Sequence, residues 1–350
     1  MTPYIAIMLA IWIQIDNTAS SQASTLLQQA HYEFLNGHFA AAERLFVDAL
    51  DQVPETDQRV RAKVLGDLGN VYSEQEEFLK AERAYSASLS LLRQLSDSKN
   101  SALMLQNLGV LYSLQGRDDE ALRFVVQALQ TVQSAVPNDP SITAQVLTGV
   151  GVVHYRRNNA RQAEKSFNQA LEIVSTLNVP FNTAELLSYL GAVYLREHKF
   201  KQAEDVLNRA LQMKEAEKGL FDPGLTPELN TLGALYMATK KFADAEQHYE
   251  RSLKILESRR SDFATTIARV LHSLSNTYSK QGRQSESDIV LGEAAKIAGE
   301  NLTKDSEMAQ IVEEYSRLLK TRGQTQEAAN LLAQVKHARA IADFVIRARP

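Results

Sequence analysis

Apolar residues recur along the chain at the spacing of amphipathic helices. In residues 105–129 they follow one another at steps of three and four on both sides of a polar break. The apolar positions are Leu105, Leu108, Tyr112, Leu122, Val125 and Leu129. This spacing predicts two helices joined by a short turn over residues 115–118. Gly116 lies in the break and can adopt the left-handed conformation that ends a helix.

The same pattern returns about every 40 residues. A small residue marks each copy, and the successive intervals are 39, 40, 42, 40, 42, 42 and 41 residues. The markers are Ala30, Gly69, Gly109, Gly151, Gly191, Gly233, Ser275 and Ser316. A second small residue follows twelve positions after each marker, and a third follows seven positions later in every copy except the last, which has Val335. A fixed period of this kind indicates a repeat architecture.

The small residues have a mechanical explanation. Two antiparallel helices approach closely only where no bulky side chain stands at their crossing, so we expect the small residues to lie there. Aromatic residues such as Tyr112 and Phe167 would fill the space on either side. Alternation of small and large side chains is typical of a dense interior.

This arrangement resembles the tetratricopeptide repeat, a helix–turn–helix unit with small residues at its eighth, twentieth and twenty-seventh positions. The resemblance covers residues 24–335 and is closest to the long, roughly 42-residue repeats of kinesin light chains. It implies an all-α fold, a right-handed α-solenoid of about eight repeats. We expect residues 336–350 to form a capping helix and tail, because they carry apolar residues at helical spacing beside several basic residues.

The first residues differ from the rest of the chain. An apolar run from Tyr4 to Ile15 precedes small and polar residues, and Ser21-Gln22-Ala23 fits a cleavage site. The run is shorter than the roughly 20 apolar residues that cross a bilayer. We therefore predict a signal peptide over residues 1–23, export across a bacterial membrane to the periplasm or beyond, and no transmembrane span in the mature chain. The alternative is a leading helix that packs on the first repeat of a cytoplasmic protein, since no Lys or Arg precedes the run.

Composition and motifs narrow the function further. The net charge of −4 over 350 residues argues against a nucleic-acid partner, and the absence of cysteine excludes thiol chemistry. The seven histidines form no metal-binding motif, and no phosphate loop or nucleophile elbow occurs. His154 takes the place of a tyrosine found in neighbouring repeats, which favours a packing role. We expect no catalytic residue, no metal and no cofactor.

The resemblance implies a concave face lined by the first helix of each repeat, with groove residues at its second, fifth, ninth and twelfth positions. Carried onto this chain, the candidate peptide-binding residues are Asn70, Gln106, Asn107, Val110, Ser113, Thr148, Val152, Tyr155, Ser188, Leu195, Asn230, Met237, Arg269, His272 and Asn276. The stripe is largely neutral, with a basic end in the last repeats. Some family members bind acidic C-terminal peptides through lysines and asparagines. In this chain Gly66 and Gln145 occupy the positions of the two lysines of this carboxylate clamp.

These observations favour a non-enzymatic scaffold that binds a protein or peptide partner. One alternative is a cytoplasmic regulatory or sensor module that acts with a separate effector. A second is an enzyme with a site that no motif reveals, and a third is self-association through the terminal repeats.

Overall fold

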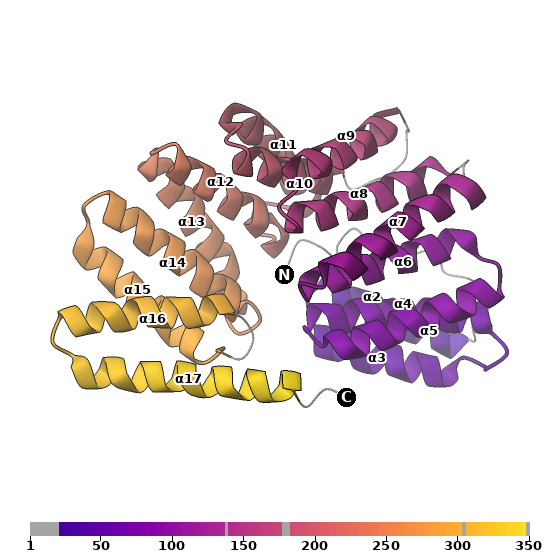
Figure 1. Ribbon diagram of the computed structural model, residues 1–350, viewed down its shortest axis with the longest axis horizontal. Helices are drawn as coiled ribbons and strands as arrows, with labels where there is room; N and C mark the ends of the chain where they lie inside the picture. The colour runs from indigo at the N-terminus through magenta and orange to yellow at the C-terminus, as the bar shows by residue number, and fades with distance from the viewer. Residues whose placement is uncertain (1–20, 137–138, 177–182, 303–305, 348–350) are drawn as a thin grey trace. The chain divides into compact units, whose positions relative to one another are not determined.

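The protein, seen here in a computed structural model that describes residues 21–136, 139–176, 183–302 and 306–347, is built of helices in antiparallel pairs (Figure 1). It forms two compact units, Met1–Val206 and Leu207–Pro350. In each pair we call the first helix the A helix and the second the B helix. No strand occurs in the described ranges.

The first unit contains nine complete helices among its described residues. They are α2 (Ser21–Leu35), α3 (Phe39–Gln52), α4 (Gln58–Glu74), α5 (Phe78–Gln94), α6 (Ser98–Leu114), α7 (Asp118–Ala135), α8 (Pro140–Arg156), α9 (Ala160–Thr176) and α10 (Thr183–Arg196). Helix α11 (Phe200–Lys218) begins in this unit and ends in the next.

The second unit continues the same alternation over its described part. Its helices are α12 (Thr226–Ala238), α13 (Phe242–Leu256), α14 (Ala264–Lys280), α15 (Gln284–Gly299), α16 (Ser306–Thr321) and α17 (Thr325–Arg347). Short 3₁₀ turns, η1 (Pro223–Leu225) and η2 (Glu257–Arg259), lie in the links between pairs. The described residues thus form eight helical hairpins, and the predicted all-α repeat fold is confirmed.

Aspartates begin three of the A helices. The side chains of Asp57, Asp97 and Asp139 accept hydrogen bonds from the backbone N–H groups three residues further on, at 3.1–3.2 Å. These bonds satisfy donors that a helix leaves unpaired at its first turn. Pro140 follows Asp139 at the first helical position, where its missing N–H is harmless. The aspartates in the loops before these three A helices therefore define where each of the three starts.

A left-handed residue ends the A helix of every hairpin. It lies seven positions after the marker residue, and its φ is between 57° and 80°. The eight residues are Gly37, Glu76, Gly116, Asn158, His198, Lys240, Gly282 and Gly323. In each case the next N–H bonds back to the carbonyl at marker plus three, as in Arg117 N to Tyr112 O at 2.9 Å. This is the hydrogen bond of a Schellman cap, and it reverses the chain into the B helix.

The hairpins close where the marker glycines meet the B helix. The ring of Tyr85 lies against Gly69, the ring of Phe167 against Gly151, and the ring of Tyr249 against Gly233. Each ring comes from the residue sixteen positions after the marker. The prediction that small residues allow a close crossing of the two helices is confirmed. At these three glycines the nearest atoms of the B helix belong to an aromatic side chain. In the seventh hairpin the two small residues touch directly, since Ser275 Oγ lies 3.0 Å from Ser287 Oγ.

Both predicted terminal segments stay predictions. Residues 1–20 of the predicted signal peptide lie outside the described residues, whereas Ser21 already belongs to α2 and Ala23 is buried. At the other end, α17 runs without a break from Thr325 to Arg347, so residues 336–347 continue the last B helix. Among the helices described, none combines the length and the apolarity needed to cross a membrane.

Candidate functional site

In the first unit, seven of the predicted groove residues are buried. They are Asn70, Gln106, Asn107, Val110, Ser113, Thr148 and Val152, and none exposes more than 4% of its surface. The expectation of an exposed stripe therefore does not hold for these side chains. Part of the burial comes from direct packing of α6 on α8, two A helices of consecutive hairpins. Their role in binding stays a prediction.

Two glycines make this close packing of A helices possible. A Cβ atom on Gly149 of α8 would clash with the side chain of Gln106 on α6, and one on Gly66 of α4 would lie 3.2 Å from Met104 Sδ. From the sequence, Gly66 was noted only because it occupies a position at which some family members have a peptide-binding lysine. The structure assigns it a packing function, because the neighbouring side chain occupies the space that a lysine would need.

Amide side chains gather inside this buried face. Asn70 Oδ1 accepts a hydrogen bond from Tyr85 Oη at 2.8 Å and a longer one from Asn107 Nδ2 at 3.4 Å. Two amide oxygens, Gln106 Oε1 and Asn107 Oδ1, have no hydrogen-bond partner within the described part of the chain although both are buried. A buried acceptor without a donor is costly, so these two oxygens are unfavourable for stability as they stand.

Three predicted residues of the first unit remain partly accessible. Tyr155, Ser188 and Leu195 are half-buried. Ser188 Oγ donates a hydrogen bond to Ala184 O of the same helix at 2.8 Å. Tyr155 and Leu195 come from the last turns of α8 and α10, and their side chains form the reachable part of the predicted groove.

In the second unit, the predicted residues are mostly half-buried and the basic ones are paired. Arg269 Nε lies 2.8 Å from Glu307 Oε2, and His272 Nε2 lies 2.9 Å from Glu314 Oε2. Asn276 is exposed and contacts His272 Nε2 at 3.3 Å. Asn230 and Met237 are half-buried, and Met237 Sδ accepts a hydrogen bond from Thr277 Oγ1. Because carboxylates of α16 lie beside Arg269 and His272, this end carries less positive charge than the sequence alone suggests.

Ion pairs connect consecutive hairpins near their turns. A glutamate at marker plus thirteen pairs with a basic residue of the next hairpin: Glu82 with Arg117 at 3.2 Å, Glu164 with Lys199 at 2.8 Å, and Glu246 with Arg283 at 2.7 Å. The basic groups also lie over the rings of the tyrosines that precede them, as Arg117 does at 4.1 Å from the Tyr112 centroid. Burial and a hydrogen bond to Glu82 raise the pKa of Tyr112 to about 12.

The pair of this type is missing between the third and fourth hairpins, α6–α7 and α8–α9, which are connected instead by the ion pair of Arg157 with Asp119 at 3.7 Å. Leu122 and Asn159 occupy the positions of the glutamate and its basic partner, and His154 replaces the tyrosine. Burial, together with the nearby Arg157, lowers the pKa of His154, and its Nδ1 has no hydrogen-bond partner among the described residues.

A cavity of about 590 Å³ opens at this junction. Its lining comes from the end of α6 and the following turn, from the end of α8 and from the end of α10: Ser113, Leu114, Gly116, Asp118, Tyr155, Arg156 and Arg196. We call it the arginine cavity. Ser113 and Tyr155 were predicted as groove residues, whereas the two arginines were not. The sequence did contain a signal for these two arginines, because Arg156 and Arg196 each follow the marker glycine of their repeat by five positions.

Each arginine holds the end of the preceding A helix. Arg156 Nε donates to Ser113 O at 3.2 Å, and Arg196 Nη1 donates to Tyr155 O at 2.5 Å and to Asn158 Oδ1 at 3.5 Å. The guanidinium of Arg196 also stacks on the Tyr155 ring, 3.8 Å from its centroid. These contacts satisfy carbonyls at helix C-termini and keep both guanidinium groups in the cavity wall.

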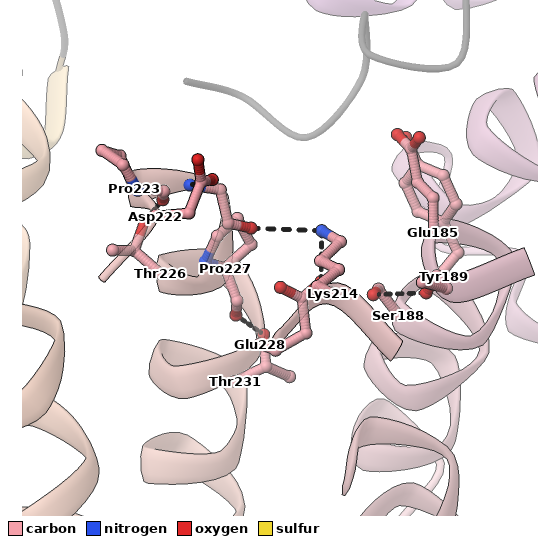
Figure 2. Close-up of polar contacts among 12 residues, drawn as sticks. Glu185, Ser188, Tyr189, Lys214, Asp222, Pro223, Thr226, Pro227, Glu228 and Thr231 are labelled. Carbon is pink, nitrogen blue, oxygen red and sulfur yellow. Dashed lines mark hydrogen bonds and ion pairs between the residues drawn. The ribbon is translucent and has the colours of Figure 1, made fainter. Parts of the chain in front are cut away.

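The second unit contains a buried ion pair (Figure 2). Lys214 Nζ lies 2.8 Å from Glu228 Oε1 and donates to Gly224 O at 3.2 Å. The Glu228 side chain is fully buried and that of Lys214 exposes 13% of its surface. Asp222 Oδ1 accepts from Gly224 N at 2.7 Å and so shapes the loop that carries the accepting carbonyl. The pair connects α11 to the start of α12 and has a structural role.

The described residues contain no cluster of three or more histidine and carboxylate side chains that could hold a metal ion.

The helical hairpins, their caps and their glycine crossings define the class of α-helical hairpin repeat proteins. The family model of the tetratricopeptide repeat matches residues 60–134, 141–216 and 226–300, which is well over half of the chain. The chain therefore belongs to the tetratricopeptide repeat family. No curated protein matches it.

Solved structures share this fold at low sequence identity. A Rap protein complexed with competence and sporulation factor has a TM-score of 0.63 and 17% identity, covering 85% of this chain and 78% of its own. A Rap conjugation gene regulator of plasmid pLS20, in complex with the Phr* peptide, has a TM-score of 0.61 and 15% identity, covering 79% and 73%. BtubC from P. vanneervenii, also called BKLC, has a TM-score of 0.55 and 18% identity, covering 63% and 90%.

Proposed function

We propose that this protein is a non-enzymatic interaction scaffold that binds an extended peptide segment of a partner along the A helices of its first unit. The observation that carries the proposal is the pair of buried amide oxygens, Gln106 Oε1 and Asn107 Oδ1, which lack a donor in the described chain. A peptide backbone presents N–H donors at regular spacing and can supply them once the two amide side chains rotate towards the surface.

Further support comes from half-buried residues at the ends of the A helices α8 and α10. Tyr155 and Leu195 offer apolar contact area, and aromatic anchors of this kind are enriched in binding sites. Of two Rap proteins with the same fold, one is in complex with competence and sporulation factor and the other with the Phr* peptide. Family membership adds a general expectation of protein binding, which for this chain remains part of the proposal.

The test is selection of peptides from a random library displayed on phage, with the immobilised full chain as bait. Binding of the enriched peptides is then measured by fluorescence polarisation for the wild type, Leu195→Glu and Val126→Glu. Val126 lies on the B helix α7 with 43% exposure, so it is the matched control. Val110 and Val152 are unsuitable because a glutamate there would bury a charge.

We expect a peptide consensus and affinity at least about tenfold weaker for Leu195→Glu, because a charge in an apolar contact loses more than 1 kcal/mol. Val126→Glu should bind like the wild type. If no consensus emerges, or if both variants lose affinity equally, binding along the A helices is wrong.

A further inference from the structure

The arginine cavity places two guanidinium groups from consecutive hairpins in one wall. Arg156 and Arg196 come from equivalent positions, 40 residues apart, at the ends of α8 and α10. The cavity volume of about 590 Å³ falls in the range of about 300–1,000 Å³ that is usual for small-ligand sites. The lining includes Ser113 and Tyr155, which also belong to the predicted groove, so a peptide on the A helices can extend into the cavity.

The charges of the lining favour a monovalent anion. The two arginines contribute two positive charges and Asp118 contributes one negative charge. A single carboxylate balances this net charge, whereas a phosphate dianion would exceed it and repel Asp118. The charge of the described lining residues therefore favours a carboxylate over a phosphate dianion.

The geometry of Arg196 leaves donors for such a ligand. Among the described residues its hydrogen bonds use Nη1 alone, and a guanidinium has further N–H groups on Nε and Nη2. Stacking on Tyr155 holds the planar group in place, so less side-chain entropy is lost when it binds. A carboxylate can then accept two parallel hydrogen bonds from it.

We propose that the arginine cavity is a subsite for one carboxylate of the peptide partner, either an Asp or Glu side chain or the C-terminal carboxylate. This inference rests on the proposed function and specifies the chemistry of the partner. It places a basic part of the groove in the first unit, whereas Arg269 and His272 of the last repeats are paired with glutamates.

The test is a titration of the full chain with N-acetyl-aspartate N-methylamide, followed through the Nε–Hε NMR signals of its arginines. The neutral N-acetyl-asparagine N-methylamide is the matched ligand, and inorganic phosphate is a third probe. Arg196→Gln and Arg59→Gln are the matched variants, since Arg59 is an exposed arginine of α4 outside the cavity lining. Assignment of the Arg196 signal follows from its loss in Arg196→Gln.

We expect the aspartate compound to shift the Arg156 and Arg196 signals in a saturable way, with binding at least about tenfold tighter than for the asparagine compound. Arg196→Gln should abolish this preference and Arg59→Gln should keep it. Equal binding of the two compounds, tighter binding of phosphate, or an unchanged preference in a folded Arg196→Gln would each overturn the proposal.

Two features keep the test decisive. If Arg196→Gln does not fold by circular dichroism, the comparison of the two compounds on the wild type still decides, with Arg196→Lys as a charge-preserving replacement. The titration uses no selected peptide, so carboxylate binding can be found when the peptide selection fails, and can be absent when that selection succeeds.

Discussion

Gly109 on α6 lies directly against Val125 on α7, so that a Cβ atom at position 109 would come within 2.6 Å of Val125 Cγ1 and 3.0 Å of Ala121 O. The neighbour at 3.0 Å is backbone and cannot move away without shifting a helix. We predict that Gly109→Ala lowers the free energy of unfolding by about 1–3 kcal/mol, as overpacking of a dense contact does.

Helix propensity alone predicts the opposite sign, since alanine is favoured over glycine inside a helix by about 1 kcal/mol. The control is Gly299→Ala in α15, where the nearest neighbouring atom would lie 3.9 Å away. That variant should be neutral or slightly stabilised. Urea unfolding followed by circular dichroism measures both, and a Gly109→Ala protein as stable as the wild type would contradict the close crossing.

The left-handed turn residues provide a prediction of stabilisation. Lys240 has a φ of 62°, a conformation that costs an ordinary residue about 1 kcal/mol and costs glycine little. Lys240→Gly should therefore stabilise the protein by up to about 1 kcal/mol, measured as an increase in the free energy of unfolding in urea.

The reciprocal variant tests the same backbone geometry. Gly116→Ala has open space around the added Cβ atom but keeps a φ of 70°, so it should destabilise by about 1 kcal/mol. If Lys240→Gly destabilises while Gly116→Ala is neutral, the turns do not adopt this conformation in solution.

The buried pair of Lys214 and Glu228 predicts strong coupling. Lys214→Met leaves the carboxylate of Glu228 buried beside an apolar methionine side chain. Removal of one partner of a buried ion pair lowers the free energy of unfolding by about 3–5 kcal/mol. The double variant Lys214→Met with Glu228→Leu should recover most of this loss, because no buried charge remains.

A double-mutant cycle from urea unfolding measures the coupling energy. Lys99, whose ion pair with Asp139 is largely accessible, is the control, and Lys99→Met should cost about 0–1 kcal/mol. Additive effects of the Lys214 and Glu228 changes would show that the two side chains act independently.

His154 predicts a loss of stability in mild acid. Its pKa is lowered by burial and by Arg157, whereas the pKa of an unfolded histidine is about 6.5. The folded protein therefore binds this proton less readily than the unfolded chain, and the protein becomes less stable as the pH falls below about 6.5. Above that pH the group has no effect on stability.

His154→Tyr introduces the residue that the equivalent position has in other hairpins, such as Tyr112. It should lose less thermal stability between pH 7.5 and pH 5.5 than the wild type does. The control is His198→Asn, an exposed histidine in a left-handed turn that asparagine tolerates. An NMR titration that places the pKa of His154 above 6.5 would refute this explanation.

Much of the fold could be predicted from the residues. The recurrence of small residues at Gly69, Gly109 and Gly151, with apolar positions at steps of three and four, predicted helical hairpins that the structure confirms. The left-handed turn was predicted at Gly116. At Glu76, His198 and Lys240 it was not, because no local signal marks a residue whose conformation the surrounding hairpin imposes.

The binding face was less predictable. Repeat position placed Val110 and Val152 on a groove wall, but their exposure depends on how closely the neighbouring A helices approach. Gly149 permits that approach by making room for Gln106, a contact between residues 43 positions apart. Periodicity describes a single helix and contains no information on the distance between helices.

By itself, the sequence determined the helical repeat, its register and the family, because these follow from local spacing that every hairpin repeats. The tertiary structure alone decided which side chains are accessible, that Arg269 and His272 are paired with glutamates of the next hairpin, and that Arg156 and Arg196 line one cavity. Such properties arise when helices from different repeats pack together, and the packing of each pair depends on side chains that the repeat does not conserve from one copy to the next.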